Sequence, residues 1–392
     1  MTLQKNLLGL VFFFMLSATQ AQLNPLALYN ETYDEYAFVE SANEYENITT
    51  DVAIPAALSE DLKEVKIYDF LEGRSVSVGK ATENFIVESL PFNSNTSDYA
   101  PSFYKGELVF ASSRNSKSFT VILQENTNEP FLDLYTTNKN IANKGVSKLK
   151  GAINTKFHES SATFSPDGKT VYFTRNNYAN RKFKRNTKGC VLLKIYKADY
   201  VNGKWKNVAE LPFNSDEYST AHPALSPDGK FLYFASDMPG SNGKSDIYVV
   251  AVHEDGSYGK PQNLGSLINS AGRETFPFVS DKGTLFFTSD GHLGFGGLDI
   301  FMVLPDDHTG WEVYNMGVPI NSPEDDFTFI INEEYHMGYF ASNRSGGKGG
   351  DDIYGFKQLT ALQEYRNHMP EIKRKIKRHL DIKPATEEVT SF

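Results

Sequence analysis

Acidic residues at one matching position of a repeated pattern are the strongest candidates for chemistry in this chain. The position lies three residues before a strand that recurs along the sequence. If those strands surround a common axis, the carboxylates gather at one mouth of a channel, where their mutual repulsion raises their pKa values or attracts a cation or basic partner. The aligned residues are Asp98, Glu159, Thr220, Glu274 and Asp325. The alternative, which we favour, is that each caps its own repeat through local hydrogen bonds.

A second set of aspartates stands at the start of another recurring strand. Asp246, Asp299 and Asp352 each precede Ile-Tyr or Ile-Phe. A carboxylate there can accept hydrogen bonds from the backbone N–H groups of the adjoining turn. Calcium ligation is the alternative, but each loop supplies too few acids for a site of six or more oxygens. We therefore expect these aspartates to be structural loop carboxylates, and we expect no metal site.

No pattern typical of a catalytic centre stands out. The sequence lacks HExxH, Gly-x-Ser-x-Gly and P-loop motifs. Glycine-rich loops such as GHLGFGGLD lie between two strands, so turn geometry explains their glycines without a nucleotide. We expect no catalytic residue and no cofactor. The formal charge of −10, from 39 bases and 49 acids, argues against nucleic-acid binding, which needs Lys and Arg at the phosphates.

An internal repeat of 52 to 61 residues organises the chain. Each copy contains an asparagine, a strand, a tight turn, an aromatic strand, a polar loop and another strand. In FSPDGKTVYF, Pro166 and Gly168 supply the backbone angles that reverse the chain. The aromatic strands are apolar on both faces, which is typical of sheets packed between other sheets. The repeat asparagines are Asn93, Asn154, Asn214, Asn269 and Asn321.

These features predict an all-β protein, a β-propeller of four-stranded blades around an axis. The first strand of the pattern, Phe85 to Leu90, has no blade before it, and the last, Asp352 to Phe356, has no strand after it. Pairing them closes a ring of five blades and removes an exposed edge. The alternative is six blades, with VKIYDF (Val65 to Phe70) starting a degenerate one.

The pattern SPDGK, YFAS, DIY resembles the WD40-like, Pro-Asp-type β-propeller repeats of TolB-like proteins and of OmpA-like envelope proteins of Gram-negative bacteria. SDYAPSFYKGELVFASSR, from Ser97 to Arg114, is similar to the propeller of envelope proteins of the gliding and type IX secretion kind. The resemblance covers roughly Phe85 to Phe356. No helical TPR array precedes it and no OmpA-like peptidoglycan-binding domain follows, so cell-wall anchoring is not implied.

The two ends differ from the repeats. Residues 1–21 have the charged start, short apolar core and Ala21 cleavage position of a signal peptide. Residues 22–64 carry ten acids against Lys63 alone, which predicts an acidic arm. The propeller is expected over 65–357. Residues 358–392 are basic, with apolar residues at helical spacing, and predict an amphipathic helical tail. No segment is long and apolar enough to be a transmembrane helix.

The resemblance and the signal peptide together imply a non-catalytic binding scaffold of the cell envelope, in the periplasm or associated with the outer membrane. Its partner would be an envelope protein, and its role would be accessory to an outer-membrane or secretion complex. The alternative function is a glycan-binding or glycan-hydrolysing propeller. Hydrolysis needs two carboxylates that converge in one pocket, and fold alone does not assign function.

Overall fold

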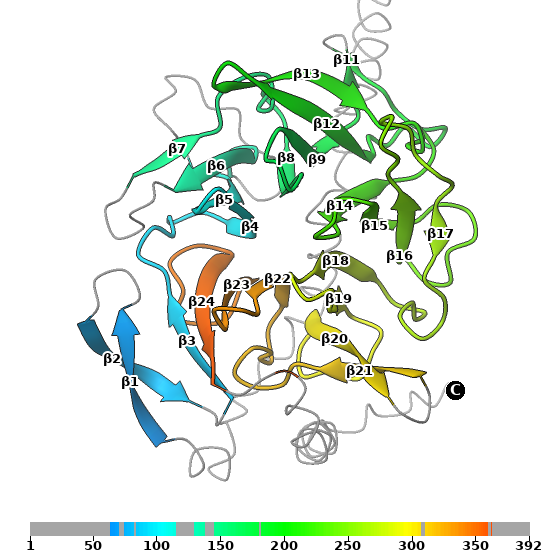
Figure 1. Cartoon of the computed structure of the whole chain (residues 1–392). Helices are drawn as coiled ribbons and strands as arrows, with labels where there is room; N and C mark the ends of the chain where they lie inside the picture. Colours follow the sequence, from blue (N-terminus) through cyan, green and yellow to red (C-terminus); the bar gives the residue numbers. More distant parts are fainter. Residues whose placement is uncertain are drawn as a thin grey trace, which may run out of the picture.

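A computed structural model describes residues 63–69, 74–81, 84–114, 129–137, 145–179, 182–306, 310–359 and 362. Five four-stranded antiparallel sheets stand around a central axis (Figure 1). The described part of the chain is therefore an all-β, five-bladed β-propeller, as predicted. The leader, the acidic arm up to residue 62 and most of the basic tail lie outside the described residues. Within the described residues, no helix has the length and apolar character needed to cross a membrane.

The first four blades each use four strands that follow one another from the axis outward. Blade 1 holds β4 (Asp98–Tyr104), β5 (Glu107–Ser112), β6 (Asp133–Thr137) and β7 (Val146–Lys148). Blade 2 holds β8 (Glu159–Phe164), β9 (Thr170–Asn176), β12 (Leu193–Val201) and β13 (Lys204–Glu210). Blade 3 holds β14 (Thr220–Leu225), β15 (Phe231–Ser236), β16 (Asp246–Ala251) and β17 (Gln262–Asn263). Blade 4 holds β18 (Glu274–Val279), β19 (Leu285–Ser289), β20 (Asp299–Asp306) and β21 (Gly310–Asn315).

Blade 5 closes the ring with strands from both ends of the propeller. It holds β22 (Asp326–Asn332), β23 (Met337–Ser342), β24 (Asp352–Gln358) and, as its outer strand, β3 (Phe85–Ser89). The pairing runs from Ser89 opposite Tyr354 to Phe85 opposite Gln358. The predicted closure is confirmed.

Two short hairpins lie apart from the blades. Among the described residues, the strand that contains VKIYD, β1 (Lys63–Asp69), pairs only with β2 (Arg74–Ala81) in a two-stranded sheet, so it does not start a sixth blade. Figure 1 shows this hairpin beside β3 and β24. The second hairpin, β10 (Tyr178–Ala179) with β11 (Lys182–Phe183), projects from blade 2.

The core lies between the blades, because each sheet is apolar on both faces. One cluster joins blades 1 and 2 and includes Val109, Phe173 and Trp205, all buried. Another joins blades 4 and 5 through Phe286, Phe329 and Phe356. A blade alone would leave these rings in water, so the repeats are stable only when they pack side by side.

Candidate functional site

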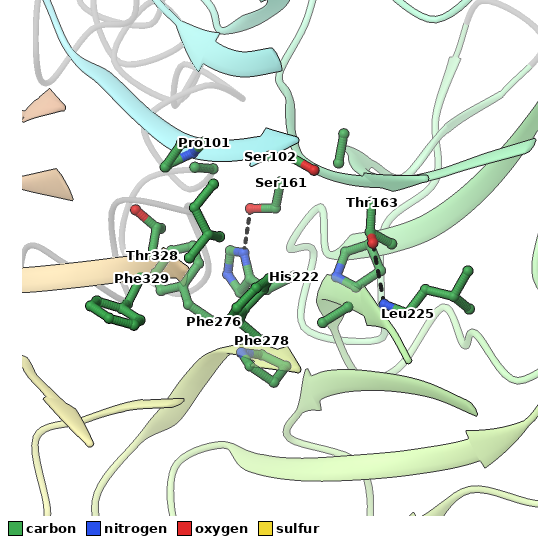
Figure 2. A pocket seen from close by; sticks show the side chains of 16 residues that line it. Pro101, Ser102, Ser161, Thr163, His222, Leu225, Phe276, Phe278, Thr328 and Phe329 are labelled. Carbon is green, nitrogen blue, oxygen red and sulfur yellow. Dashed lines mark hydrogen bonds between the residues drawn. The ribbon is translucent and has the colours of Figure 1, made fainter. Parts of the chain in front are cut away.

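An axial pocket of about 70 Å³ is bounded by the inner strands of all five blades (Figure 2). Its walls combine hydroxyl groups, proline and aromatic rings with one imidazole. Within the described residues, no Asp or Glu lines it. The residues that the argument below uses are Ser102, Ser161, His222, Phe276 and Thr328.

The same backbone irregularity shapes the pocket in every blade. The third residue of each inner strand has a positive φ, between 38° and 56°, and a β-bulge occurs at that point. Positive φ is rare for bulky residues, so the fivefold repetition marks a feature of the fold rather than a local accident. In three blades a proline follows, which suits a bulge because proline donates no backbone hydrogen bond. The five residues are Ala100, Ser161, His222, Phe276 and Thr328.

Two of these residues form a hydrogen-bonded pair across neighbouring blades. Ser161 Oγ lies 2.8 Å from His222 Nδ1, and the His222 ring packs on Phe276 with centroids 3.8 Å apart. Burial lowers the pKa of His222 to about 3, so its imidazole is neutral and a weak base. A weak base does not activate a serine hydroxyl. The pair therefore suits hydrogen bonding to a ligand better than nucleophilic chemistry.

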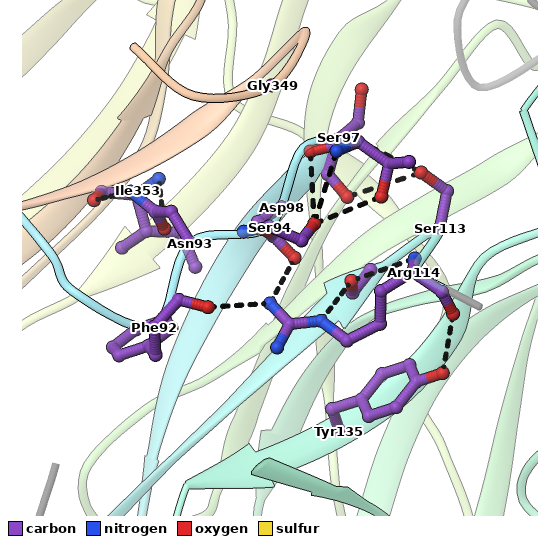
Figure 3. A network of polar contacts seen from close by, with 12 residues as sticks. Phe92, Asn93, Ser94, Ser97, Asp98, Ser113, Arg114, Tyr135, Gly349 and Ile353 are labelled. Atoms are coloured by element: carbon purple, nitrogen blue, oxygen red, sulfur yellow. Dashed lines mark hydrogen bonds and ion pairs between the residues drawn. The ribbon is translucent and has the colours of Figure 1, made fainter. Parts of the chain in front are cut away.

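The candidate acids of the channel mouth do not face the pocket. Asp98, Glu159 and Glu274 are the first residues of β4, β8 and β18, and each is fully buried. Asp98 shows why (Figure 3): its Oδ2 accepts the Ser94 N–H at 2.5 Å, and its Oδ1 pairs with Arg114 Nη2 at 2.6 Å. Arg114 also donates to the Phe92 carbonyl at 3.1 Å. The acid thus fastens the start of its blade to the preceding crossover.

Glu159 and Glu274 repeat this arrangement. Glu159 accepts the Thr155 N–H at 2.7 Å and pairs with Arg175 Nε at 2.9 Å. Glu274 accepts the Ser270 N–H at 2.7 Å and, in place of an arginine, the Ser289 hydroxyl at 2.6 Å. Thr220, the aligned residue of blade 3, donates to its repeat asparagine, Asn214.

In blade 5 the matching acid is Asp326, not the expected Asp325. Asp326 lies opposite Ser342, as Asp98 lies opposite Ser112, and it pairs with Arg344 at 2.5 Å. The spacing from the repeat asparagine carried the signal: Asp98, Glu159, Glu274 and Asp326 each stand five residues after theirs. Asp325 stands four residues after Asn321 and so falls one residue short of this spacing.

The arginines were not singled out from the sequence. Arg114, Arg175 and Arg344 lie at or just after the end of the second strand of blades 1, 2 and 5, and each guanidinium stacks on aromatic rings about 5 Å away. Arg175 and Arg344 also donate to two crossover carbonyls each. An arginine that closely follows serine or threonine after an aromatic strand was the available signal. These residues hold the blades rather than a ligand.

Asp325 instead joins two blades. Its Oδ1 accepts the Leu298 N–H from blade 4 at 2.8 Å, and only 2% of its surface is exposed. Burial, and to a lesser degree the neighbouring Asp326 carboxylate, raises the pKa of Asp325 from 3.8 to about 6. Its ionisation therefore weakens the folded state.

This shift predicts a pH dependence for Asp325→Asn. The raised pKa gives Asp325 a stabilising contribution that is complete below pH 3.8 and is lost as the pH rises through about 6. The substituted asparagine keeps the oxygen acceptor and cannot ionise. We expect the variant to gain up to about 3 kcal/mol relative to wild type between pH 4 and pH 7, measured by urea unfolding.

Asp228→Asn is the control, because hydrogen bonds from Ser226 lower the pKa of Asp228 and the sign reverses. If the free energies of unfolding of Asp325→Asn and wild type changed with pH in parallel, ionisation of Asp325 would not destabilise the folded state.

The aspartates at the third-strand starts accept backbone N–H groups of the loops before them. Asp246 accepts from Asn242 at 2.7 Å and Gly243 at 3.0 Å. Asp299 accepts from Phe295 and from Gly296, the latter at 3.1 Å. Asp352 accepts from Lys348 and from Gly349, the latter at 3.2 Å. Within the described residues, no group of three or more His, Cys, Asp or Glu side chains is arranged to hold a metal ion.

The repeat asparagines, which the sequence showed only as landmarks, are the joints between blades. Asn269 accepts the Ile247 N–H at 2.7 Å and donates to the Ile247 carbonyl at 3.0 Å, so one amide replaces a strand partner. Asn93 does the same with Ile353 across the ring closure, at 3.1 and 2.8 Å. The other three bond the equivalent residues Leu134, Ile195 and Ile300.

The similarities of this chain to known proteins are to solved structures, at identities of 15% or lower. No family model matches the chain, and no curated protein matches it. Similar solved structures include TolB from Acinetobacter baumannii, at 15% identity and a TM-score of 0.32, over 76% of this chain and 49% of that one. This chain thus spans about half of that TolB. A putative TolB from Agrobacterium tumefaciens has 14% identity and a TM-score of 0.39, over 71% and 98%.

Enzymes occur among the similar structures too. An α-L-arabinofuranosidase from Lactobacillus brevis has 14% identity and a TM-score of 0.44, over 69% of this chain and 92% of that one. The propeller is what they share.

Proposed function

We propose that this protein is a non-catalytic binding scaffold of the cell envelope, exported by its leader, which holds a protein partner at the axial pocket. The observation that carries the proposal is the pocket wall, which combines apolar groups from all five blades with hydroxyls from blades 1, 2 and 5. Thr328 Oγ1 is buried there and has no hydrogen-bond partner within the described chain. A buried hydroxyl without a partner is costly and favours a ligand, or water, that bonds to it.

Glycoside hydrolysis is the alternative, and the acids of this chain argue against it. A glycosidase needs an acid and a second carboxylate about 5 to 9.5 Å apart, both reaching one pocket. Asp98, Glu159 and Glu274 are fully buried and bonded within their own repeats. They stabilise their own blades and do not line the pocket in which a sugar would bind.

Filling the pocket tests the proposal. Ser102 lines it and is half-buried, so Ser102→Trp should block the pocket, while Ser257→Trp, on an exposed turn, is the matched control. With mature protein as bait in cross-linked envelope extracts, we expect Ser102→Trp to lower partner recovery at least tenfold and Ser257→Trp to leave it unchanged. Both variants should unfold near the wild-type temperature.

Enzyme assays complete the test. We expect no turnover of aryl arabinofuranosides or xylosides. Turnover that Glu274→Gln abolishes would show that the protein is a hydrolase and not a non-catalytic scaffold. Equal partner recovery by both tryptophan variants would show that the partner binds away from the pocket.

A further inference from the structure

The connection between the second and third strands of blade 2 is longer than its counterparts in blades 3 to 5. It spans residues 177–192, whereas the connections 237–245, 290–298 and 343–351 of blades 3 to 5 have nine residues each. The extra length builds the β10–β11 hairpin and a second turn in which Asn186 Oδ1 accepts the Lys188 and Cys190 N–H groups, at 2.9 and 2.8 Å. The insertion is therefore a built structure rather than a loose loop.

Aromatic rings attach this insertion to the body of the propeller. Phe157, in the crossover from blade 1, packs on Tyr178 and Phe183 with centroids 4.6 and 4.2 Å apart. Lys156 places its ammonium 5.1 Å from the Phe157 ring. The packing gives the insertion a fixed position at the end of the propeller where the inner strands begin.

The insertion presents an excess of positive charge. Lys156, Lys184, Arg185 and Lys188 are exposed, and we call these four residues and the three rings the basic platform. Two nearby acids offset part of this charge. Asp216 lies 4.0 Å from Lys184 and also pairs with the buried Lys194 at 2.5 Å. Glu217 accepts hydrogen bonds from the Thr187 N–H and hydroxyl, at 3.2 and 2.8 Å, which leaves two of the four positive charges in excess.

We propose that the basic platform binds the chain's own acidic arm, residues 22–62. The arm contains nine acids and no Lys or Arg, interspersed with tyrosine and phenylalanine. Its carboxylates match the bases of the platform, and its rings match the aromatic cluster. This inference does not depend on the proposed function, because the platform lies outside the axial pocket.

The arm is long enough to reach the platform. It joins the propeller at β1, beside blade 5, and about twenty extended residues span up to about 70 Å. A compact domain of this size has a radius of gyration of roughly 19 Å. Tethering also raises the effective concentration of the arm to about the millimolar range, so weak, salt-screened ion pairs suffice to hold it.

Lysine reactivity in the full mature chain tests the proposal, with internal controls. Acetylation by N-hydroxysuccinimide acetate, quantified by mass spectrometry, is compared between wild type and a variant whose nine arm acids are changed to Gln or Asn. We expect Lys156, Lys184 and Lys188 to react at least threefold faster in the variant, and in wild type at high salt, about 0.5 M NaCl. Lys230, Lys260 and Lys282, exposed elsewhere, should react at unchanged rates.

Carbodiimide cross-linking then identifies the occupant. We expect cross-links between arm carboxylates and platform lysines whose yield does not change on tenfold dilution. Cross-links that vanish on dilution would mean a second copy occupies the platform. Cross-links from the arm to the tail lysines instead, or equal acetylation of platform and control lysines, would overturn the proposal.

Discussion

Arg175→Met should destabilise the propeller by roughly 3–5 kcal/mol, because it leaves a buried carboxylate without its partner. Arg175 pairs with the fully buried Glu159 at 2.9 Å and donates to the carbonyls of Ala152 and Ile153, at 3.0 and 2.8 Å. One substitution thus removes three hydrogen bonds at the joint between blades 1 and 2. Urea unfolding at pH 8 measures the effect.

The double variant Glu159→Gln/Arg175→Met should recover part of that loss, because no buried charge remains. The loss in Arg175→Met should also shrink at pH 5, since burial raises the pKa of Glu159 and its protonation removes the unpaired charge. Lys169→Met is the control: Lys169 and Asp167 form an exposed pair 3.6 Å apart, worth about 0–1 kcal/mol. Equal losses of stability in Arg175→Met and Lys169→Met would show that the buried pair contributes no more than an exposed one.

Deleting residues 84–92 should prevent recovery of a folded monomer, whereas deleting residues 22–60 should leave the propeller folded. The first deletion removes β3, opens the ring and exposes the edge of β24 to other chains. The expected loss is comparable with the whole stability of a domain, about 5–15 kcal/mol. Circular dichroism and size-exclusion chromatography distinguish a folded monomer from aggregates.

A point substitution makes the same test on a protein that still folds. Phe85 is fully buried and packs edge-on against Phe356, with centroids 5.7 Å apart. We expect Phe85→Ala to cost about 3–5 kcal/mol, and Phe231→Ala, at a ring that is 45% exposed, to cost far less. Equal losses would mean that the closing strand does not carry the stability of the ring.

The architecture could be predicted because its signals are local. The turn at Pro166 and Gly168 and the aromatic strand that follows it recur in phase, and each specifies strand and turn without reference to the rest of the chain. The strand left over at each end then indicated the ring closure and five blades. Apart from the place of VKIYD, no knowledge of tertiary contacts was needed for this.

The roles of the acids could not be decided in the same way. Type and spacing indicated that Asp98 and Glu159 belong to one set, but whether such a carboxylate faces a channel or a guanidinium depends on where Arg114 and Arg175 come to lie. Those arginines are sixteen residues away along the chain and adjacent only across a strand pair. A one-residue error at Asp325 also changed the assignment, because successive residues of a strand meet different neighbours.

By itself, the sequence determined the repeat, the blades and their closure, since hydrophobic alternation and turn residues act within a few positions. The tertiary structure decided which side chains face one another. In the folded protein the strand-start acids point into their own blades, and the repeat asparagines join neighbouring blades. The fold also brings Ser161, His222 and Thr328 from three blades to one axis. The physical reason is that burial and partnership are properties of packed neighbours, and these neighbours lie across a strand pair or in another repeat of the chain.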